Sequence, residues 1–238
     1  MINRARLFRR IRNLLIQLTL CVLILTVVPI IALRWVDPPT TLFMLADRWE
    51  AALEDEPGYR FRYEWRDLAG IDPDIQLAVI AAEDQRFADH GGFDLIEIGN
   101  AVSARLDGTS TRGASTLTQQ TAKNLFLWSG QSWVRKGLEA WLTLWIEWLW
   151  PKTRILEVYL NIAEFGPGVF GVEAASRRFF NTSAERLSAE RSALLAAVLP
   201  NPGVYRVDAP GPKVLNRQRW ILKQIRGIGG NAYLRRLE

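Results

Sequence analysis

An uncharged, strongly apolar segment near the start of the chain is the feature that most restricts how this sequence can fold. Residues 14–33 contain no charged side chain. A helix of this length reaches about 30 Å, which matches the hydrocarbon core of a bilayer. A cleaved signal peptide has a shorter apolar core, of about 7 to 15 residues, followed by a small-residue cleavage site. The residue two positions before Ala32 is Ile30, which is not small, so we predict an uncleaved membrane anchor.

Positive charge is concentrated in the tail before this segment. Residues 1–13 contain five arginines and no acidic residue. The positive-inside rule predicts that this tail stays in the cytoplasm and that the rest of the chain lies outside. The whole chain has 30 basic and 25 acidic residues, so the part after the tail has 25 of each. A nucleic-acid-binding domain needs a basic surface, and this balance argues against one.

The chain after the anchor is about 200 residues long, which is enough for one domain with a hydrophobic core. Residues 34–70 read as a linker followed by an irregular segment, because Pro38 and Pro39 stop any helix that continues from the anchor. We expect a short amphipathic helix over residues 40–53 and a strand or extended arm over residues 59–65.

Helical signals dominate from residue 71 to the end of the chain. Asp72 followed by Pro73 is a helix N-cap with proline in the first turn. The only cysteine, Cys21, lies in the predicted anchor, so no intrachain disulfide can stabilise the domain. Residues 71–238 are therefore predicted to form one mainly α domain with little or no sheet. The expected helices cover residues 72–83, 115–126, 132–150, 152–163, 168–180, 188–199 and 213–226.

The helix expected over residues 132–150 is rich in tryptophan and otherwise largely apolar. Two interpretations of it are open. It is either a core helix with one solvated charged side, or a helix whose aromatic face lies at the bilayer interface. At about 100° per residue, one narrow side carries the charged and polar residues, namely Arg135, Lys136, Glu139, Thr143 and Glu147.

The segment GASTLTQQTAKN, residues 113–124, places polar side chains along one helix face. Thr116, Gln119, Gln120 and Lys123 follow the spacing i, i+3, i+4, i+7. The glycine-led loop before them leaves backbone amides free at the helix start, which is a natural site for an anion. The segment is either a solvated polar face or a binding face for a sugar or a phosphate.

Two adjacent carboxylates, Glu83 and Asp84, end the apolar helix that starts at residue 72. The negative end of the helix dipole favours the neutral form of Glu83, which suits a group that takes up a proton. Asp84 either adds to the effect on Glu83, through its own negative charge, or holds the local turn. The alternative is that Glu83 and Asp84 are an ordinary pair of solvated acids at a helix end. His90, the only histidine, precedes Gly91 and Gly92, which suggests a tight turn that positions its ring.

Four motifs, in this order, resemble those of the family 51 peptidoglycan glycosyltransferases. EDQRFADHGG (83–92) resembles E-D-x-x-F-x-x-H-x-G, and GASTLTQQTAKN (113–124) resembles G-x-S-T-x-x-Q-Q-x-x-K-N. RKGLE (135–139) resembles R-K-x-x-E, and KTRILEVYLN (152–161) resembles the fourth motif. The chain ends soon after these motifs, so we expect a monofunctional member without a transpeptidase domain.

The resemblance implies a lysozyme-like, mainly α glycosyltransferase domain with an N-terminal transmembrane helix. It implies polymerisation of lipid II into β-1,4-linked glycan strands, with inversion and with release of undecaprenyl pyrophosphate, in cell-wall biosynthesis. The implied location is the bacterial inner membrane, crossed once, with a cytoplasmic N-terminus and a periplasmic catalytic domain. The implied partners are lipid II, the growing glycan strand and membrane lipid. Other cell-wall synthesis proteins are candidate partners, and nucleic acid is not.

The resemblance also assigns roles to single residues. Glu83 matches the catalytic base, which takes the proton from the 4-hydroxyl of the acceptor sugar. Glu139 matches the second essential glutamate, which assists the pyrophosphate directly, through a cation, or by holding basic side chains. Lys123, Arg135 and Lys136 match positions near phosphates. The other matches shape or line the substrate groove, and they are Asp84, Phe87, His90, Thr116, Gln119, Gln120 and Asn124.

No cofactor is required by this resemblance, and assistance from Mg²⁺ or Mn²⁺ is left open. Gln131 departs from the family, because many members carry arginine there, and the effect of this departure on the contact to the donor phosphate is left open. A lysozyme-like hydrolase or lytic transglycosylase is the first alternative, but it has no use for three phosphate-binding cations. A catalytically inactive scaffold is the second, and the presence of both glutamates argues against it.

Overall fold

The computed structural model describes residues 4–55, 58–107, 115–130 and 132–237. It divides into two compact units, Met1–Asp37 and Pro38–Glu238. The first unit contains the helix α1 (Arg4–Leu33). Its segment Phe8–Leu33 is the one helical stretch, within the described ranges, that is long and apolar enough to cross a membrane, with a mean hydropathy of 2.7. By length and composition this helix fits the predicted anchor.

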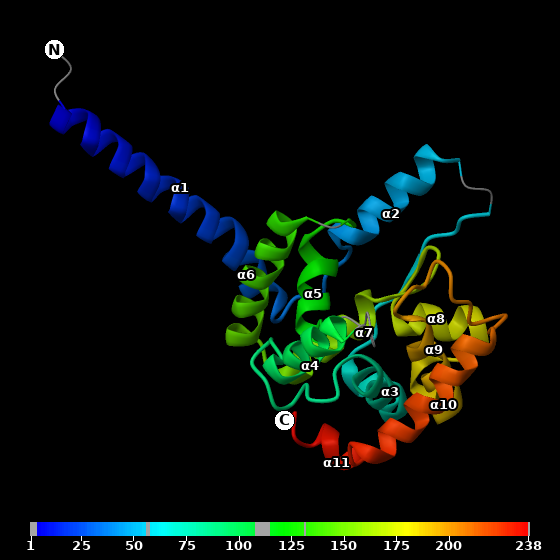
Figure 1. Cartoon of the computed structure of the whole chain (residues 1–238). Coiled ribbons are helices and arrows are strands. Elements are labelled where there is room, and N and C mark those ends of the chain that lie inside the picture. Colours follow the sequence, from blue (N-terminus) through cyan, green and yellow to red (C-terminus); the bar gives the residue numbers. More distant parts are fainter. Residues whose placement is uncertain (1–3, 56–57, 108–114, 131, 238) are drawn as a thin grey trace. The chain divides into compact units, whose positions relative to one another are not determined.

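The second unit is mainly helical, as predicted (Figure 1). Residues 34–70 are predicted as a linker followed by an irregular segment, and from Pro38 on this stretch belongs to the second unit, where α2 packs on α5. The elements of the unit are α2 (Leu42–Leu53), β1 (Arg62–Tyr63), η1 (Leu68–Gly70), α3 (Pro73–Glu83), α4 (Leu95–Leu106), α5 (Leu117–Phe126), α6 (Trp133–Leu149), α7 (Lys152–Ile162), β2 (Glu164–Gly166), β3 (Val169–Phe170), α8 (Val172–Phe180), η2 (Ala184–Arg186), α9 (Ala189–Val198), α10 (Pro212–Gly227) and α11 (Asn231–Leu234).

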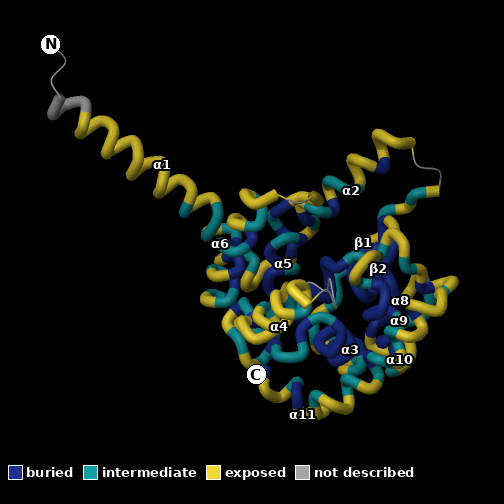
Figure 2. The backbone as a smooth tube through the Cα atoms, viewed as in Figure 1, coloured by how far each residue is buried: buried dark blue, intermediate teal, exposed yellow. Residues whose placement is uncertain are grey.

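Helix α3 forms the centre of one half of the hydrophobic core of the second unit. Its residues from Ile75 to Ala82 are all buried (Figure 2), as expected for a helix that is apolar around its whole circumference. Helices α9, α10 and α11 pack against it. Asp72 accepts a hydrogen bond from the amide of Asp74 at 2.8 Å, so the predicted start of the helix is confirmed. This packing fixes the C-terminal end of α3, where Glu83 lies.

Helix α5 forms the centre of the other half and packs against α2, α6 and α7. Thr116 begins it through a capping box. Its hydroxyl accepts a hydrogen bond from the amide of Gln119, and the Gln119 side chain accepts one from the amide of Thr116. Local sequence therefore determines where this helix starts. Gly113 and Ala114, in the glycine-led loop of the second motif, lie outside the described residues, as does Gln131.

A small three-stranded sheet and the helix α4 depart from the predicted elements. The strands lie in the order β1-β3-β2, with β1 parallel and β2 antiparallel to β3. Residues 169–170 are thus in a strand and not in the helix expected over residues 168–180. Gly171 joins β3 to α8 with a φ of +84°, and a Cβ there would lie 2.6 Å from the carbonyl oxygen of Asn161. Helix α4 was not predicted, although Asp94 caps it by accepting hydrogen bonds from two backbone amides.

The orientation of α6 contradicts the first interpretation of its charged side, that of a core helix with that side in solvent. The buried residues of α6 are Glu139, Leu142, Thr143 and Ile146, so the side that carries the carboxylate faces the protein. Trp133 and Trp148 lie on the outside and are 93% and 74% exposed. The tertiary fold therefore turns polar chemistry inward and leaves aromatic side chains on the surface.

Candidate active site

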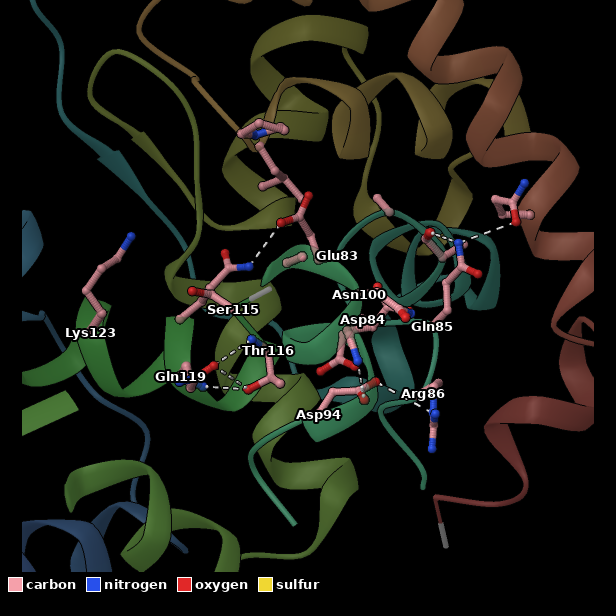
Figure 3. A pocket seen from close by; sticks show the side chains of 18 of the residues that line it. Glu83, Asp84, Gln85, Arg86, Asp94, Asn100, Ser115, Thr116, Gln119 and Lys123 are labelled. Atoms are coloured by element: carbon pink, nitrogen blue, oxygen red, sulfur yellow. Dashed lines mark hydrogen bonds and ion pairs between the residues drawn. The ribbon is translucent and has the colours of Figure 1, made fainter. Parts of the chain in front are cut away.

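A cleft of about 820 Å³ brings the predicted site residues together. It is lined by residues of α3, α4, α5, α6 and α10, and both Glu83 and Glu139 lie on its wall. Figure 3 shows Glu83 and Asp84 near Thr116 and Gln119, although the two pairs come from different helices. The cleft thus unites the first three sequence motifs, which are separated along the chain.

Glu83 is held by two hydrogen-bond donors from distant parts of the chain. Gln120 on α5 donates from Nε2 to Glu83 Oε2 at 3.0 Å. Arg217 on α10 donates from Nη2 to Glu83 Oε1 at 3.0 Å. Each carboxylate oxygen has two lone pairs, so each can accept one more hydrogen bond. The Glu83 side chain is 12% exposed, and it is therefore fixed without being closed off from the cleft.

Tyr159 supports Gln120 from inside the core. Its hydroxyl donates to Gln120 Oε1 at 3.1 Å, which orients the amide so that its nitrogen faces Glu83. Tyr159 is fully buried, and burial, followed by the nearby charge of Glu83, raises the pKa of its phenol well above the usual value. The phenol therefore stays protonated and remains a donor over the physiological pH range.

Asp84 points away from Glu83 and ties two helices together. Its Oδ1 lies 2.8 Å from His90 Nε2, and its Oδ2 accepts a hydrogen bond from the backbone amide of Leu117 at 3.0 Å. The Leu117 amide is the first of α5, where a negative charge is favoured by the helix dipole. Of the two roles left open for Asp84, this geometry corresponds to holding the local turn.

A network of polar side chains holds the backbone at His90 in place. Lys152 donates to the backbone carbonyl of His90 at 2.7 Å and lies 4.4 Å from the centre of the Phe87 ring. The same lysine pairs with Glu147 at 2.8 Å, and Thr118 also donates to Glu147. These contacts join α5, α6 and α7 to one another and to the backbone of the first motif at His90.

Glu139 is buried and holds both basic residues of the third motif. Arg135 donates from Nη1 to Glu139 Oε2 at 3.0 Å, and the ammonium of Lys136 pairs with Oε1. Arg135 Nε is buried and has no hydrogen-bond partner among the described residues. Of the three roles that the resemblance left open for Glu139, this arrangement corresponds to holding basic side chains at the cleft wall.

Lys123 reaches the same cleft from α5 (Figure 3). Burial lowers the pKa of its ammonium from the usual value, whereas the charges of Glu139 and Glu83 act in the opposite direction. Its ammonium lies 5.7 Å from the centre of the Phe43 ring. Among the residues that the structure describes, Lys123 has no ion-pair partner within 4 Å. A cation that is partly withdrawn from water interacts strongly with an incoming anion, because the electrostatic attraction is less screened there.

Most of the predicted site residues line the cleft, namely Glu83, Asp84, Thr116, Gln119, Gln120, Lys123, Arg135, Lys136 and Glu139. Phe87, His90 and Asn124 do not line it within the described structure. The Phe87 side chain is fully buried and that of His90 is 6% exposed, so in this structure they pack behind the residues that line the cleft, and their predicted role in the substrate site stays a prediction.

Sequence reasoning missed the residues that α4 and α10 contribute. The missed residues include Asn100 from α4 and Arg217, Trp220 and Gln224 from α10. Arg217 is 134 positions from Glu83, so no local pattern could have revealed their contact. Tyr159 lies within the fourth motif, but its hydrogen bond to Gln120 depends on packing between α5 and α7.

Asp84, His90 and Asp94 form the one group of candidate metal ligands found within the described residues, with ligand atoms within 4.8 Å of one another. Their oxygens already have structural partners. Asp94 caps α4, Asp84 accepts the amide of Leu117, and Arg86 lies 3.6 Å from Asp94. The donor set is therefore poorly suited to a metal ion, because the ion would have to compete with these hydrogen bonds and with the nearby guanidinium of Arg86.

The fold and the cleft define a transglycosylase. The family model described as "Transglycosylase" matches residues 51–226, and the chain belongs to this family. The resemblance inferred from the four motifs is confirmed.

Named relatives match almost the whole chain. The biosynthetic peptidoglycan transglycosylase of Stutzerimonas stutzeri (strain A1501) is 51% identical over 231 residues, which cover 96% of this chain and 95% of that protein. The protein of the same name from Pectobacterium carotovorum subsp. carotovorum (strain PC1) is 50% identical over 98% of this chain and 96% of its own length. The protein of the same name from Xylella fastidiosa (strain M12) is 49% identical over 223 residues, which cover 94% of this chain and 91% of that protein.

Proposed function

We propose that this chain is a membrane-anchored peptidoglycan glycosyltransferase that polymerises lipid II into β-1,4-linked glycan strands. The family and the names of its relatives support the reaction class. The observation that carries the proposal is a single cleft that holds a fixed, solvent-accessible carboxylate, Glu83, together with the cations Lys123, Arg135 and Lys136. This combination suits a reaction that removes a proton from a sugar hydroxyl and expels a pyrophosphate.

Glu83 acts as the general base in this proposal. It takes the proton from the 4-hydroxyl of the acceptor GlcNAc while that oxygen attacks the anomeric carbon of the donor. The free lone pairs of its carboxylate are directed by the hydrogen bonds from Gln120 and Arg217. The bond to the pyrophosphate breaks on the opposite face of the sugar, so an α-linked donor gives a β-1,4 product with inversion, and undecaprenyl pyrophosphate leaves.

Lys123, Arg135 and Lys136 stabilise the leaving group. Charge develops on the bridging oxygen of the pyrophosphate as the bond breaks, and cations placed beforehand lower the energy of that transition state. Glu139 keeps Arg135 and Lys136 aligned at the cleft wall through its ion pairs. In the part of the cleft around Glu139, the cations Lys123, Arg135 and Lys136 outnumber this carboxylate. We therefore propose that no resident metal is required and that Mg²⁺ or Mn²⁺ at most assists.

We also propose that the catalytic unit lies against the outer face of the inner membrane. The arginine-rich tail favours a cytoplasmic N-terminus, which places the unit after α1 in the periplasm. Helices α2 and α6 both pack on α5 and leave large apolar side chains exposed. Trp49 and Leu53 on α2, and Trp133 and Trp148 on α6, are each more than two thirds exposed. A lipid substrate reaches a cleft beside such a surface without leaving the bilayer.

The purified full chain in detergent, incubated with labelled lipid II, tests the proposal. The expected product is a ladder of long glycan strands that lysozyme digests. Cleavage of finished peptidoglycan would instead support the lytic alternative, and absence of both activities would support the inactive scaffold. Repeating the reaction with EDTA tests the proposed independence from a metal ion, since loss of all turnover would contradict it.

A further inference from the structure

Arg217 joins the candidate base to the backbone of the helix that carries it. Its Nη2 donates to Glu83 Oε1 at 3.0 Å and also to the carbonyl oxygen of Ala82 at 3.2 Å. The Ala82 carbonyl belongs to the last turn of α3, where carbonyl groups lack helical partners. A single guanidinium nitrogen therefore caps the end of α3 and orients the carboxylate next to that end.

Three further features describe the surroundings of Arg217. Helix α10 packs against both α3 and α9, so the backbone that carries the arginine is fixed relative to Glu83. The guanidinium lies 5.8 Å from the centre of the Trp220 ring, three residues further along the helix. Its Nε is buried without a hydrogen-bond partner among the described residues. Leaving a buried donor unpaired costs free energy, which the other contacts of this guanidinium have to offset.

We propose that Arg217 is a positioning residue for Glu83. Its guanidinium holds one oxygen of the carboxylate that accepts the proton in the proposed reaction. Together with Gln120, Arg217 restricts the carboxylate to one orientation while leaving one lone pair free on each oxygen. This inference rests on the proposed function, in which Glu83 is the general base.

Two other roles for Arg217 give different experimental results. An arginine that only holds α3 and α10 together affects stability, and a lysine in its place restores little of that contact geometry. An arginine that binds the donor phosphate affects mainly the KM for lipid II. A positioning residue lowers kcat with little change in KM, because the base is misplaced whereas the substrate still binds.

The test compares Arg217→Met, Arg217→Lys and Arg219→Met in the full chain in detergent. Arg219 is a matched control, because it is exposed on the same helix and its side chain donates a hydrogen bond to Asn216, a surface neighbour three residues away. We expect Arg217→Met to lower kcat on the order of 100-fold, since a displacement of about 1 Å at a reacting group has an effect of that size. The KM should stay within about threefold of the wild-type value. Arg217→Lys should recover about a tenth of the wild-type rate, because it keeps the charge but loses the planar fork.

The outcomes separate this inference from the function on which it rests. A wild-type protein that does not polymerise lipid II contradicts the proposed function. An active wild type with unchanged kcat in Arg217→Met contradicts only the positioning role, as does a loss confined to KM or one that is equally large in Arg219→Met.

The midpoint of thermal unfolding measures the interaction between Arg217 and Glu83 independently of enzymatic activity. The drop in midpoint caused by Arg217→Met should be at least about 2 °C smaller in a Glu83→Gln background, because part of the lost interaction is already absent. Equal drops in both backgrounds would show that the two side chains are not coupled, and would overturn the inference whatever the turnover.

Discussion

The carboxylate of Asp84 accepts a hydrogen bond from the backbone amide of Leu117 at 3.0 Å, which joins the end of α3 to the start of α5. This contact has a consequence for stability. Asp84→Ala should lower the free energy of unfolding by about 2–3 kcal/mol, because it leaves a buried amide and the His90 ring without their partner. Asp89→Ala is the control, since Asp89 forms an exposed pair with Arg236 and should matter by less than about 1 kcal/mol. Chemical denaturation in detergent measures both, and equal effects would contradict the structural role of Asp84.

Glu83→Gln should lower the rate of glycan polymerisation by about 100-fold to 10,000-fold, the range expected for the loss of a general base. The amide keeps the shape of the carboxylate, so binding of lipid II should survive. Initial rates and binding of fluorescent lipid II are the measurements. Glu185→Gln, at an exposed ion pair with Arg66, should leave both unchanged. Turnover retained in Glu83→Gln would show that another group takes the proton.

Lys123→Met should separate activity from stability. Burial lowers the pKa of the Lys123 ammonium. The folded protein therefore bears the cost of the buried charge at neutral pH, and this cost is relieved as the pH rises from the lowered pKa towards the usual value of 10.5. Removing the charge should leave the unfolding midpoint unchanged or raise it.

The same substitution should lower kcat/KM for lipid II by roughly 100-fold, since it deletes one of the three cations that stabilise the leaving group. Lys223→Met, at an exposed position of α10, is the control and should alter neither quantity. A collapse of the unfolding midpoint in Lys123→Met would show that the lysine is structural.

Glu164 should make the folded state less stable as the pH rises. Burial, and then the charge of Asp47, raise the pKa of the Glu164 carboxyl from 4.5 to about 7. Between these values the folded protein holds a proton that the unfolded chain releases, so stability falls from about pH 4.5 to pH 7 and the full loss is present above pH 7. Glu164→Gln should therefore raise the unfolding midpoint at pH 8 and change it little at pH 4.5. A difference between the two proteins that does not vary with pH would show that the carboxyl titrates normally.

The exposed tryptophans of α6 should lie within reach of lipid chains. In proteoliposomes with brominated lipids, tryptophan emission is quenched where the rings enter the acyl region. The double variant Trp133→Phe/Trp148→Phe should remove much more of the quenchable emission than Trp65→Phe/Trp220→Phe, which removes the same number of tryptophans. Equal losses in the two variants would exclude this face as the membrane-contacting surface.

Local sequence determined where several helices begin, because the groups that cap a helix start are close to it in the chain. Asp72 caps α3 as predicted, and Thr116 caps α5 one residue after the predicted start of that helix, each through hydrogen bonds within three residues. The uncharged segment of residues 14–33 likewise determined a long apolar helix by composition alone. The order of four short motifs was enough to indicate the family, since their spacing is carried by the chain itself.

Tertiary structure alone decided how these elements present their side chains. The periodicity of α6 predicted a charged side but not its direction, and packing on α5 turned Glu139 inward and left Trp133 and Trp148 on the surface. The pair of Arg217 and Glu83 depends on α10 packing against α3, which no local pattern encodes. The pairing of β1 with β3 was missed for the same reason, because these two strands lie more than 100 positions apart in the chain. Helix caps and periodicity act over a few residues, whereas a catalytic cleft is formed by contacts between residues that are distant in the chain.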